Sequence, residues 1–302
     1  MTVATTSNFS RWGFLAHLDY EAWPAARVAS VLAEQGYNSV EWTLAHFDPR
    51  RMSAAELSGV VEATRKAGLE VSEMVVQRDF VCADAEVLRD SVDLTIEVAK
   101  AAVDNGVHLL NVLTGPCRWE AGHVDVGTAM PEGQAWSLML DAFERMLDGV
   151  AKAGAAVALE PCWGGLANDY YSTLPVIERF RNHPAFGINL DPSHLVLRRN
   201  DVGWLVREWG PLIRHVHIKD VIGVPGSDGD QFMFPMIGEG RVDWSEFFTA
   251  LAAIQYRGYM SVEFESYKYY KTVLKNDPAA ASAISMVQLR ALEDLLPVEL
   301  SK

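Results

Sequence analysis

The chain has 302 residues and a formal net charge of −14, from 26 Lys and Arg against 40 Asp and Glu. This excess of negative charge repels a polyanion, so nucleic acid is a poor candidate partner. No stretch of about 18 uncharged apolar residues occurs and the first residues lack the apolar core of a signal peptide, so neither membrane insertion nor secretion is supported. Cys82, Cys117 and Cys162 form no CxxC pair, which is typical of a reducing compartment, and we expect a cytoplasmic protein.

Apolar, strand-like segments alternate with amphipathic, helix-like segments eight times along the chain. In the helix-like stretch 85–105, apolar residues recur at steps of three and four. This alternation predicts a parallel sheet, and eight units predict closure into a (β/α)8 TIM barrel, a single domain over residues 1–302. The expected strands are Gly13–His17, Ser39–Thr43, Leu69–Val76, Val107–Leu113, Ala155–Glu160, Phe186–Asp191, Ile213–Lys219 and Tyr259–Phe264.

Glycines and long loops complete the expected architecture. Gly36, Gly68, Gly106 and Gly154 each precede a strand by a few residues, where a helix is expected to end. Two connections are long for βα turns: 114–131 after the fourth strand and 221–242 after the seventh. Long loops at the C-terminal face of a barrel usually build the substrate pocket, so we expect both to do so.

Four strand ends in the second half of the chain carry side chains that bind metals: Glu160, Asp191, His217 and Glu263. The residues that alternate with each of them are small or polar, and the intervening residues are mostly apolar. In a barrel strand one set faces the helices and the other faces the interior, with chemistry at the C-terminal end. The pattern predicts a divalent-metal site. Three carboxylates and one imidazole suit Mn²⁺ best, with Mg²⁺ or Co²⁺ as alternatives, and they suit a structural Zn²⁺ less well.

Such a site favours chemistry on a sugar-like hydroxy-ketone. A carboxylate removes the proton between two neighbouring oxygens, and the metal stabilises the enediolate that forms. Return of the proton to the other face is epimerisation, and return to the neighbouring carbon is isomerisation. Expulsion of a β-substituent would make the same site a lyase. The first hypothesis is therefore a metal-dependent isomerase or epimerase, and the alternative is a metal-dependent lyase on a keto-sugar or keto-inositol.

Between Glu160 and Glu265 the sequence resembles the xylose-isomerase-like TIM-barrel superfamily, through GGLANDYYSTLPVIERFRNHPAFGINLDPSHL, HVHIKD, IGEGRVDW and SVEFES. It is most similar to the sugar isomerase/epimerase branch, which includes ketose 3-epimerases, hydroxypyruvate isomerase and inosose dehydratase. The resemblance implies that the same four residues bind the metal and that His194 contacts substrate. It further implies that Glu160 and Glu263 act as acid/base groups on opposite faces of the substrate.

At one place the sequence differs from ketose 3-epimerases, and at another it resembles particular members of the branch. Ketose 3-epimerases carry an acidic residue shortly after the fifth-strand glutamate, where this chain has Leu166 and Ala167, which disfavours a free ketohexose. The loop 221–242 resembles those of relatives that act on keto-inositols and 3-keto-glycosides. The lyase alternative is therefore of the inosose dehydratase type, or the barrel subunit of a C-glycoside deglycosidase. Barrels of this branch often form homo-oligomers or associate with a second subunit.

Several further residues are candidates at the same face. Glu265 is two positions after Glu263 and is expected to face the same side, so it is an alternative ligand. The order along the strand favours Glu263. His215 is expected to be an interior hydrogen-bonding residue, and Asp220 to anchor a substrate hydroxyl or the loop that follows. The residues expected to contact substrate, in addition to His194, are Glu41, His17, Lys219, Trp119 and Trp163.

Overall fold

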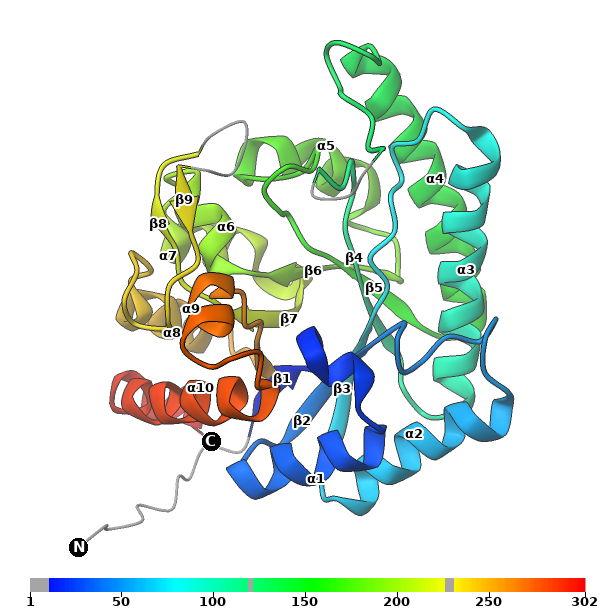
Figure 1. Cartoon of the computed structure of the whole chain (residues 1–302). Helices are drawn as coiled ribbons and strands as arrows, with labels where there is room; N and C mark the ends of the chain where they lie inside the picture. Colours follow the sequence, from blue (N-terminus) through cyan, green and yellow to red (C-terminus); the bar gives the residue numbers. More distant parts are fainter. Residues whose placement is uncertain (1–10, 119–121, 226–230, 302) are drawn as a thin grey trace, which may run out of the picture.

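Eight parallel strands close into a barrel, and helices surround it, in a computed structural model that describes residues 11–118, 122–225 and 231–301 (Figure 1). Around the barrel each strand neighbours the next in sequence, and β10 pairs with β1 to close it. The predicted (β/α)8 barrel is confirmed. Its strands are β1 (Trp12–Leu15), β2 (Ser39–Thr43), β3 (Glu70–Val75), β4 (Leu109–Val112), β5 (Ala156–Leu159), β6 (Phe186–Leu190), β7 (Ile213–Ile218) and β10 (Met260–Val262).

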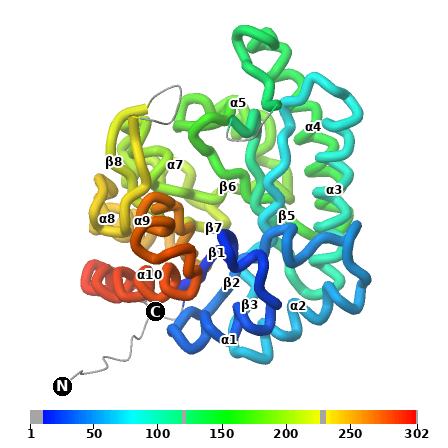
Figure 2. The backbone as a smooth tube through the Cα atoms, viewed as in Figure 1, coloured from blue at the N-terminus to red at the C-terminus, as the bar shows by residue number. Residues whose placement is uncertain are grey.

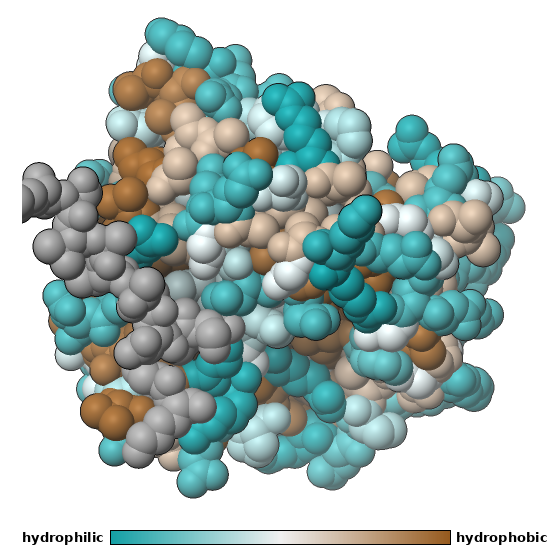
Figure 3. All heavy atoms as spheres, turned by 90° about the horizontal axis from the view of Figure 1, so that it is seen from below, coloured by the Kyte–Doolittle hydropathy of each residue, from teal (hydrophilic) through white to brown (hydrophobic). Residues whose placement is uncertain are grey.

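The helices follow the strands in sequence, so that the chain runs once round the barrel (Figure 2). They are α1 (Ala25–Gln35), α2 (Ala54–Lys66), α3 (Ala85–Asp104), α4 (Glu132–Ala153), α5 (Tyr170–Phe180), α6 (Pro192–Leu197), α7 (Val202–Trp209), α8 (Trp244–Ala253), α9 (Tyr267–Thr272), α10 (Pro278–Leu292) and α11 (Val298–Ser301), with 3₁₀ turns η1 (Leu18–Ala22), η2 (Gly210–Leu212) and η3 (Glu293–Leu295). None of the helices in the described part of the chain has the length and apolar character needed to cross a membrane. On the face in Figure 3, hydrophobic residues form scattered patches between hydrophilic ones.

The predicted helix stops are confirmed. α1 ends at Gly36 and α4 at Gly154, both in the left-handed conformation, with φ of 99° and 90°. Gly68 and Gly106 also have positive φ, 87° and 74°. A residue with a Cβ atom is strained in this conformation, so glycine ends these helices at low cost.

Side chains that alternate along the strands fall into an apolar set and a small or polar set, as predicted. One set of side chains belongs to the large apolar core: Val157, Leu159, Ile188, Leu190, Val216, Ile218, Val262 and Phe264. The other set is small or polar, and its polar members Asn189, His215 and Ser261 are equally buried, at no more than 1% exposed. These polar side chains hydrogen-bond to one another or to partners on other strands across the barrel. The barrel interior below the mouth is therefore a polar network.

The two long connections differ from each other. Residues 114–131 join β4 to α4 without a strand of two or more residues among the described positions. Residues 221–242 contain a short antiparallel hairpin, β8 (Ile222–Gly223) with β9 (Phe232–Met233), which the sequence did not predict. Strands of two residues are too short to show an alternating pattern. In Figure 1 this yellow hairpin stands on the same side of the barrel as α9.

The loop 221–242 is held by the carboxylate of Asp220, which follows β7 and is 1% exposed. Its Oδ1 atom accepts hydrogen bonds from the backbone N–H groups of Val221 (2.9 Å) and Val242 (3.1 Å). Its Oδ2 atom accepts from the N–H groups of Gly238 and Gly240, both at 3.0 Å, and from the indole N–H of Trp244 at 3.3 Å. Of the two roles expected for Asp220, the structure therefore supports anchoring of the loop.

Replacing Asp220 by Asn is expected to loosen this loop. One of the two acceptor oxygens becomes an NH₂ group that faces N–H donors, and we expect a loss of about 3 kcal/mol in the free energy of unfolding. Urea denaturation measures that loss, and amide hydrogen exchange should become faster in residues 236–242. Glu239→Gln, an exposed change in the same loop, is the matched control. Equal stability of the two variants would contradict the anchoring role.

Candidate metal centre

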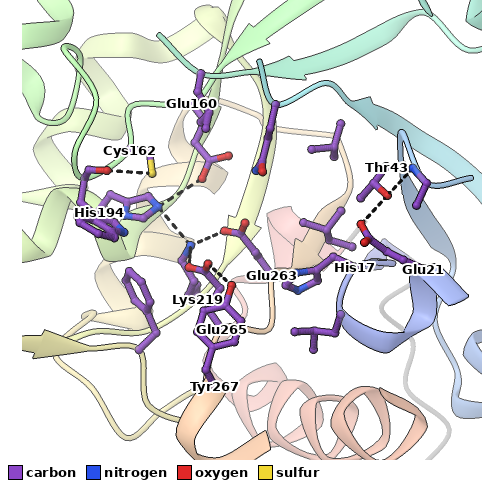
Figure 4. Close-up of a pocket in the computed structure, with 18 of the residues that line it drawn as sticks. His17, Glu21, Thr43, Glu160, Cys162, His194, Lys219, Glu263, Glu265 and Tyr267 are labelled. Carbon is purple, nitrogen blue, oxygen red and sulfur yellow. Dashed lines mark hydrogen bonds and ion pairs between the residues drawn. The ribbon is translucent and has the colours of Figure 1, made fainter. Parts of the chain in front are cut away.

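The four residues expected to bind a metal come together at the C-terminal mouth of the barrel. Glu160 and Glu263 directly follow β5 and β10, Asp191 is the N-cap of α6, and His217 lies in β7. All are buried, at 2%, 7%, 1% and 0% exposed. Figure 4 shows Glu160 and Glu263 directed toward the same space from different strands, with Lys219 and His194 beside them.

The carboxylate of Glu160 is held from below by two amides. Its Oε2 atom accepts hydrogen bonds from Nδ2 of Asn111 (2.9 Å) and Nδ2 of Asn189 (3.1 Å). Burial raises the pKa of a carboxyl group, but the charge of His217 and the close approach of the His194 and His217 imidazoles outweigh it and hold the pKa of Glu160 well below its usual range. Glu160 is therefore fixed in orientation and ionised at neutral pH.

The imidazole of His217 connects the mouth with the barrel interior. Its Nδ1 atom lies 3.4 Å from an oxygen of Glu160 and 3.4 Å from an oxygen of Glu263. Its Nε2 atom lies 3.1 Å from Glu41 Oε2, and the other Glu41 oxygen is 2.7 Å from His215 Nε2. Burial lowers the pKa of an imidazole, but the charges of Glu160 and Glu41 raise the pKa of His217 well above its usual value.

Lys219 brings the main positive charge to the mouth. Its Nζ atom lies 3.0 Å from Asp191 Oδ2 and 2.8 Å from Glu265 Oε2, and it also donates to Glu263. Burial lowers the pKa of an ammonium group, but the charges of Asp191, Glu263 and Glu265 raise the pKa of Lys219 well above its usual value. Even with His217 protonated, two positive groups face four carboxylates, because Glu160 belongs to the same cluster. A divalent cation would balance the remaining charge, which is costly to bury alone.

Two buried atoms support a metal at this place. Asp191 Oδ2 and His217 Nδ1 have no hydrogen-bond partner among the described residues, although Asp191 forms the ion pair with Lys219. His217 Nδ1 lies 3.4 Å from an oxygen of Glu160 and of Glu263, and a carboxylate oxygen of Asp191 lies within 4.8 Å of an oxygen of each. Oxygens with one imidazole nitrogen are a donor set for a hard divalent ion. His194 is a second candidate imidazole: its Nε2 atom is 3.5 Å from Glu160 and 3.7 Å from Asp191. One ligand atom each of Glu160, Asp191, His194 and Glu263 lies within 4.8 Å of the others. His217 Nδ1 approaches Glu160 and Glu263 to 3.4 Å each, but His217 forms its own such group with Glu41, Glu73 and His215.

A cavity of about 950 Å³ opens above this cluster. Of the residues expected to contact substrate, His17, His194, Lys219 and Trp163 line the cavity, and so does Glu265. In Figure 4, His17 lies on the far side of the cavity from His194.

Two of the expected substrate contacts have a different outcome. Glu41 is completely buried and does not line this cavity. Its carboxylate contacts His215 and His217, so the geometry does not support the predicted contact with substrate. The prediction that Glu41 faces the barrel interior was right. Glu41 lies in the middle of β2, however, and therefore below the mouth. Trp119 lies outside the described residues.

Sequence reasoning missed Glu73, Asn111 and Asn189 as parts of the site. Glu73 is completely buried in β3, 3.7 Å from His217 Nε2, and its two oxygens have no hydrogen-bond partner in the described part of the chain. Burial and the charge of Glu41 raise the pKa of Glu73 well above its usual range. A carboxylate or amide within an apolar strand, as in LEVSEMVV, was the available signal. A register shift after Val40 brings Glu73 opposite Glu41, and no local pattern reveals that shift.

Solved structures with the same fold include several sugar-modifying enzymes. D-psicose 3-epimerase, in the presence of D-fructose, superposes with a TM-score of 0.72 at 15% identity, over 95% of this chain and 99% of that one. The 3-keto-D-glucoside 4-epimerase YcjR from E. coli gives 0.72 at 18% identity, over 93% and 99%. The probable 3-DHS dehydratase AsbF from Bacillus anthracis gives 0.71 at 14% identity, over 93% and 98%. At such identities the likeness establishes the fold.

Sequence comparison identifies the family. A curated relative, the uncharacterized protein YfiH of Bacillus subtilis (strain 168), is 32% identical over 106 residues, 29% of this chain. The match spans about a third of that relative, 34% of its length. The family model described as the xylose isomerase-like TIM barrel matches residues 29–290, most of the chain. The chain belongs to the xylose isomerase-like TIM barrel family.

Proposed function

We propose that this protein is a divalent-metal-dependent isomerase or epimerase of a sugar-like hydroxy-ketone. The observation that carries the proposal is the pair of buried carboxylates, Glu160 and Glu263, that approach one imidazole atom, His217 Nδ1, to 3.4 Å each at the floor of a large cavity. The likeness in fold to sugar epimerases supports the substrate class.

Glu160, Asp191, Glu263 and Nδ1 of His217 would hold the ion, and their donor set favours Mn²⁺, with Mg²⁺ or Co²⁺ as alternatives. When bound, such an ion supplies a Lewis acid that stabilises negative charge on two adjacent substrate oxygens. The Nε2–H group of His217 would donate to Glu41, which leaves the Nδ1 lone pair directed at the mouth. Glu41 thus acts through His217, as a positioning residue.

The chain's own groups account for proton transfer. Glu160 and Glu263 have lowered pKa values: burial raises both, but for Glu160 the charge of His217 prevails, and for Glu263 the charge of Lys219. Either carboxylate can therefore accept the proton between the two substrate oxygens. The other, after taking up a proton from solvent, can deliver it to the opposite face, and the first then loses its proton to solvent. Lys219 and His194 line the same cavity and can donate hydrogen bonds to substrate hydroxyls.

A lyase remains the second candidate, because the likeness to a probable dehydratase covers 98% of that protein. Incubation of the Mn²⁺-loaded protein with a panel of keto-sugars in D₂O separates the two. Deuterium at the carbon next to the carbonyl, with recovery of an isomeric sugar, is the result expected for an isomerase or epimerase. An unsaturated product with loss of a leaving group would establish the lyase. No exchange with any hydroxy-ketone would overturn both.

Loss of a proposed ligand should weaken metal binding more than loss of the residue that orients this ligand. His217→Ala removes a ligand and should abolish stoichiometric Mn²⁺ binding, measured by isothermal titration calorimetry and elemental analysis. Glu41→Gln keeps the ligand but weakens its orientation, so Mn²⁺ affinity should fall about 10- to 100-fold. His183→Ala, on a half-buried histidine after α5 whose ring contacts the exposed Asp148 and accepts a hydrogen bond from the Ala185 N–H group, is the matched control. Full metal content in His217→Ala would refute the assignment.

Metal binding should release a proton. In the metal-free protein the pKa of His217 is raised, so the ring is protonated at neutral pH and must lose a proton before it can bind a cation. The apparent Mn²⁺ affinity should therefore weaken as the pH falls, and flatten above the raised pKa. Calorimetric enthalpies in buffers of different ionisation enthalpy give the number of protons released. A value of zero near pH 7 would contradict this interpretation.

Glu160→Gln and Glu263→Gln should each lower turnover by roughly 10²-fold or more, because the amide cannot accept a proton. Each rate is measured at saturating Mn²⁺, with metal content determined in parallel, so that weaker metal binding is not mistaken for loss of the base. Glu265→Gln, at the neighbouring carboxylate that also pairs with Lys219, is the comparison. Near-normal turnover in both principal variants at full occupancy would exclude the two-carboxylate mechanism.

A further inference from the structure

A row of aromatic rings forms one wall of the cavity. Trp163, in the segment between β5 and α5, contacts Phe232 of β9 edge to face, with ring centroids 5.1 Å apart. Phe232 in turn contacts Phe234 at 5.5 Å. All three line the cavity, and Trp163 and Phe232 are only half-buried. Two separate loops therefore build one apolar wall.

The inner end of this row touches the polar cluster. The ring of Phe234 stands edge-on to the imidazole of His194, at 5.5 Å and 89°. Nζ of Lys219 lies over the same ring, 4.6 Å from its centroid. The wall thus begins at groups that flank the proposed metal ligands and extends outward through Phe232 to Trp163. A ligand whose reactive part sits on the cluster would lay its next atoms against these rings.

The size and lining of the cavity argue against a single free sugar. A volume of 950 Å³ is near the upper end of the range for small-molecule sites, roughly 300 to 1,000 Å³. A free ketose carries a hydroxyl group on nearly every carbon. It can cover an aromatic ring only with its C–H groups, and its hydroxyl groups need polar partners that Phe232 and Phe234 do not offer. A flat apolar group, in contrast, gains free energy by covering half-buried rings and by stacking on them.

We infer that the substrate carries a flat apolar substituent, such as the aryl group of a glycoside, beside its hydroxy-ketone, and that Trp163, Phe232 and Phe234 bind that substituent. The inference rests on the proposed function for the part of the substrate that reacts. It concerns a separate part of the cavity, so binding can be measured without turnover. The specificity of the enzyme would then lie in the hairpin β8–β9 and the segment after β5.

Unreactive probes test this directly. Methyl and phenyl β-D-glucopyranoside differ only in the substituent, and their dissociation constants from the Mn²⁺-loaded protein are measured by isothermal titration calorimetry. We expect the phenyl glucoside to bind at least about tenfold more tightly. Phe232→Ala should remove most of that difference while changing the affinity for the methyl glucoside less than about twofold. Phe232→Leu, which keeps apolar area and disturbs the hairpin less, should give an intermediate loss.

The matched control is Tyr171→Ala, which removes an aromatic ring that is 70% exposed on α5. It should leave both affinities unchanged. Equal affinity of the wild-type protein for the two glucosides would overturn the inference, and so would an equal loss for both probes in Phe232→Ala and Phe232→Leu. The 3-keto forms of the same glucosides, incubated in D₂O, test the proposed function separately. Absence of deuterium exchange with an intact phenyl preference would overturn the function and retain the aromatic subsite.

Discussion

The constraint on which the site depends is an excess of buried negative charge at the mouth of the barrel. Glu160, Asp191, Glu263 and Glu265 surround a single ammonium group, that of Lys219. Carboxylates taken out of water repel one another unless cations compensate them. The ion pairs of Lys219 relieve part of this repulsion, and a divalent ion would relieve the rest. The cluster is therefore suited to holding a metal and unsuited to packing alone.

The end of β7 organises both halves of the cavity. Lys219 points into the charged cluster, and the next residue, Asp220, points away from it and binds four backbone N–H groups of the loop 221–242. That loop carries Phe232 and Phe234, so the aromatic wall is fixed to the same strand end as the charged groups. Two successive side chains just after β7 thus couple the position of the reactive groups to that of the wall.

Below the mouth, the polar barrel interior sets the orientation of the ligands. Asn111 and Asn189 fix the carboxylate of Glu160, and Glu41 bridges His215 and His217. These side chains exclude apolar packing from the centre of the barrel, which costs stability. In return, each proposed ligand is held by a neighbour that is itself buried and hydrogen-bonded, and a ligand held in this way needs little reorganisation when a metal binds.

Much of the fold and part of the site could be predicted from the sequence, because strand periodicity and helix ends are local properties. Alternation within a strand gives the face of a side chain, and the end of a strand gives its height in a parallel barrel. These two facts were enough to bring Glu160, Asp191, His217 and Glu263 to one mouth. Gly36 and Gly154 ended their helices as expected for the same local reason.

Only the tertiary structure decided what depends on the register between strands and on closure of the barrel. The contact of Glu41 with His217 joins residues 176 positions apart, and the register shift between β2 and β3 places Glu73 beside them. The hairpin β8–β9 was invisible because its strands have two residues each. The sequence by itself determined which chemical groups stand at the mouth of the barrel. Their partners were decided by the closure of the barrel, because side chains that meet across it are distant in sequence and no local pattern relates them.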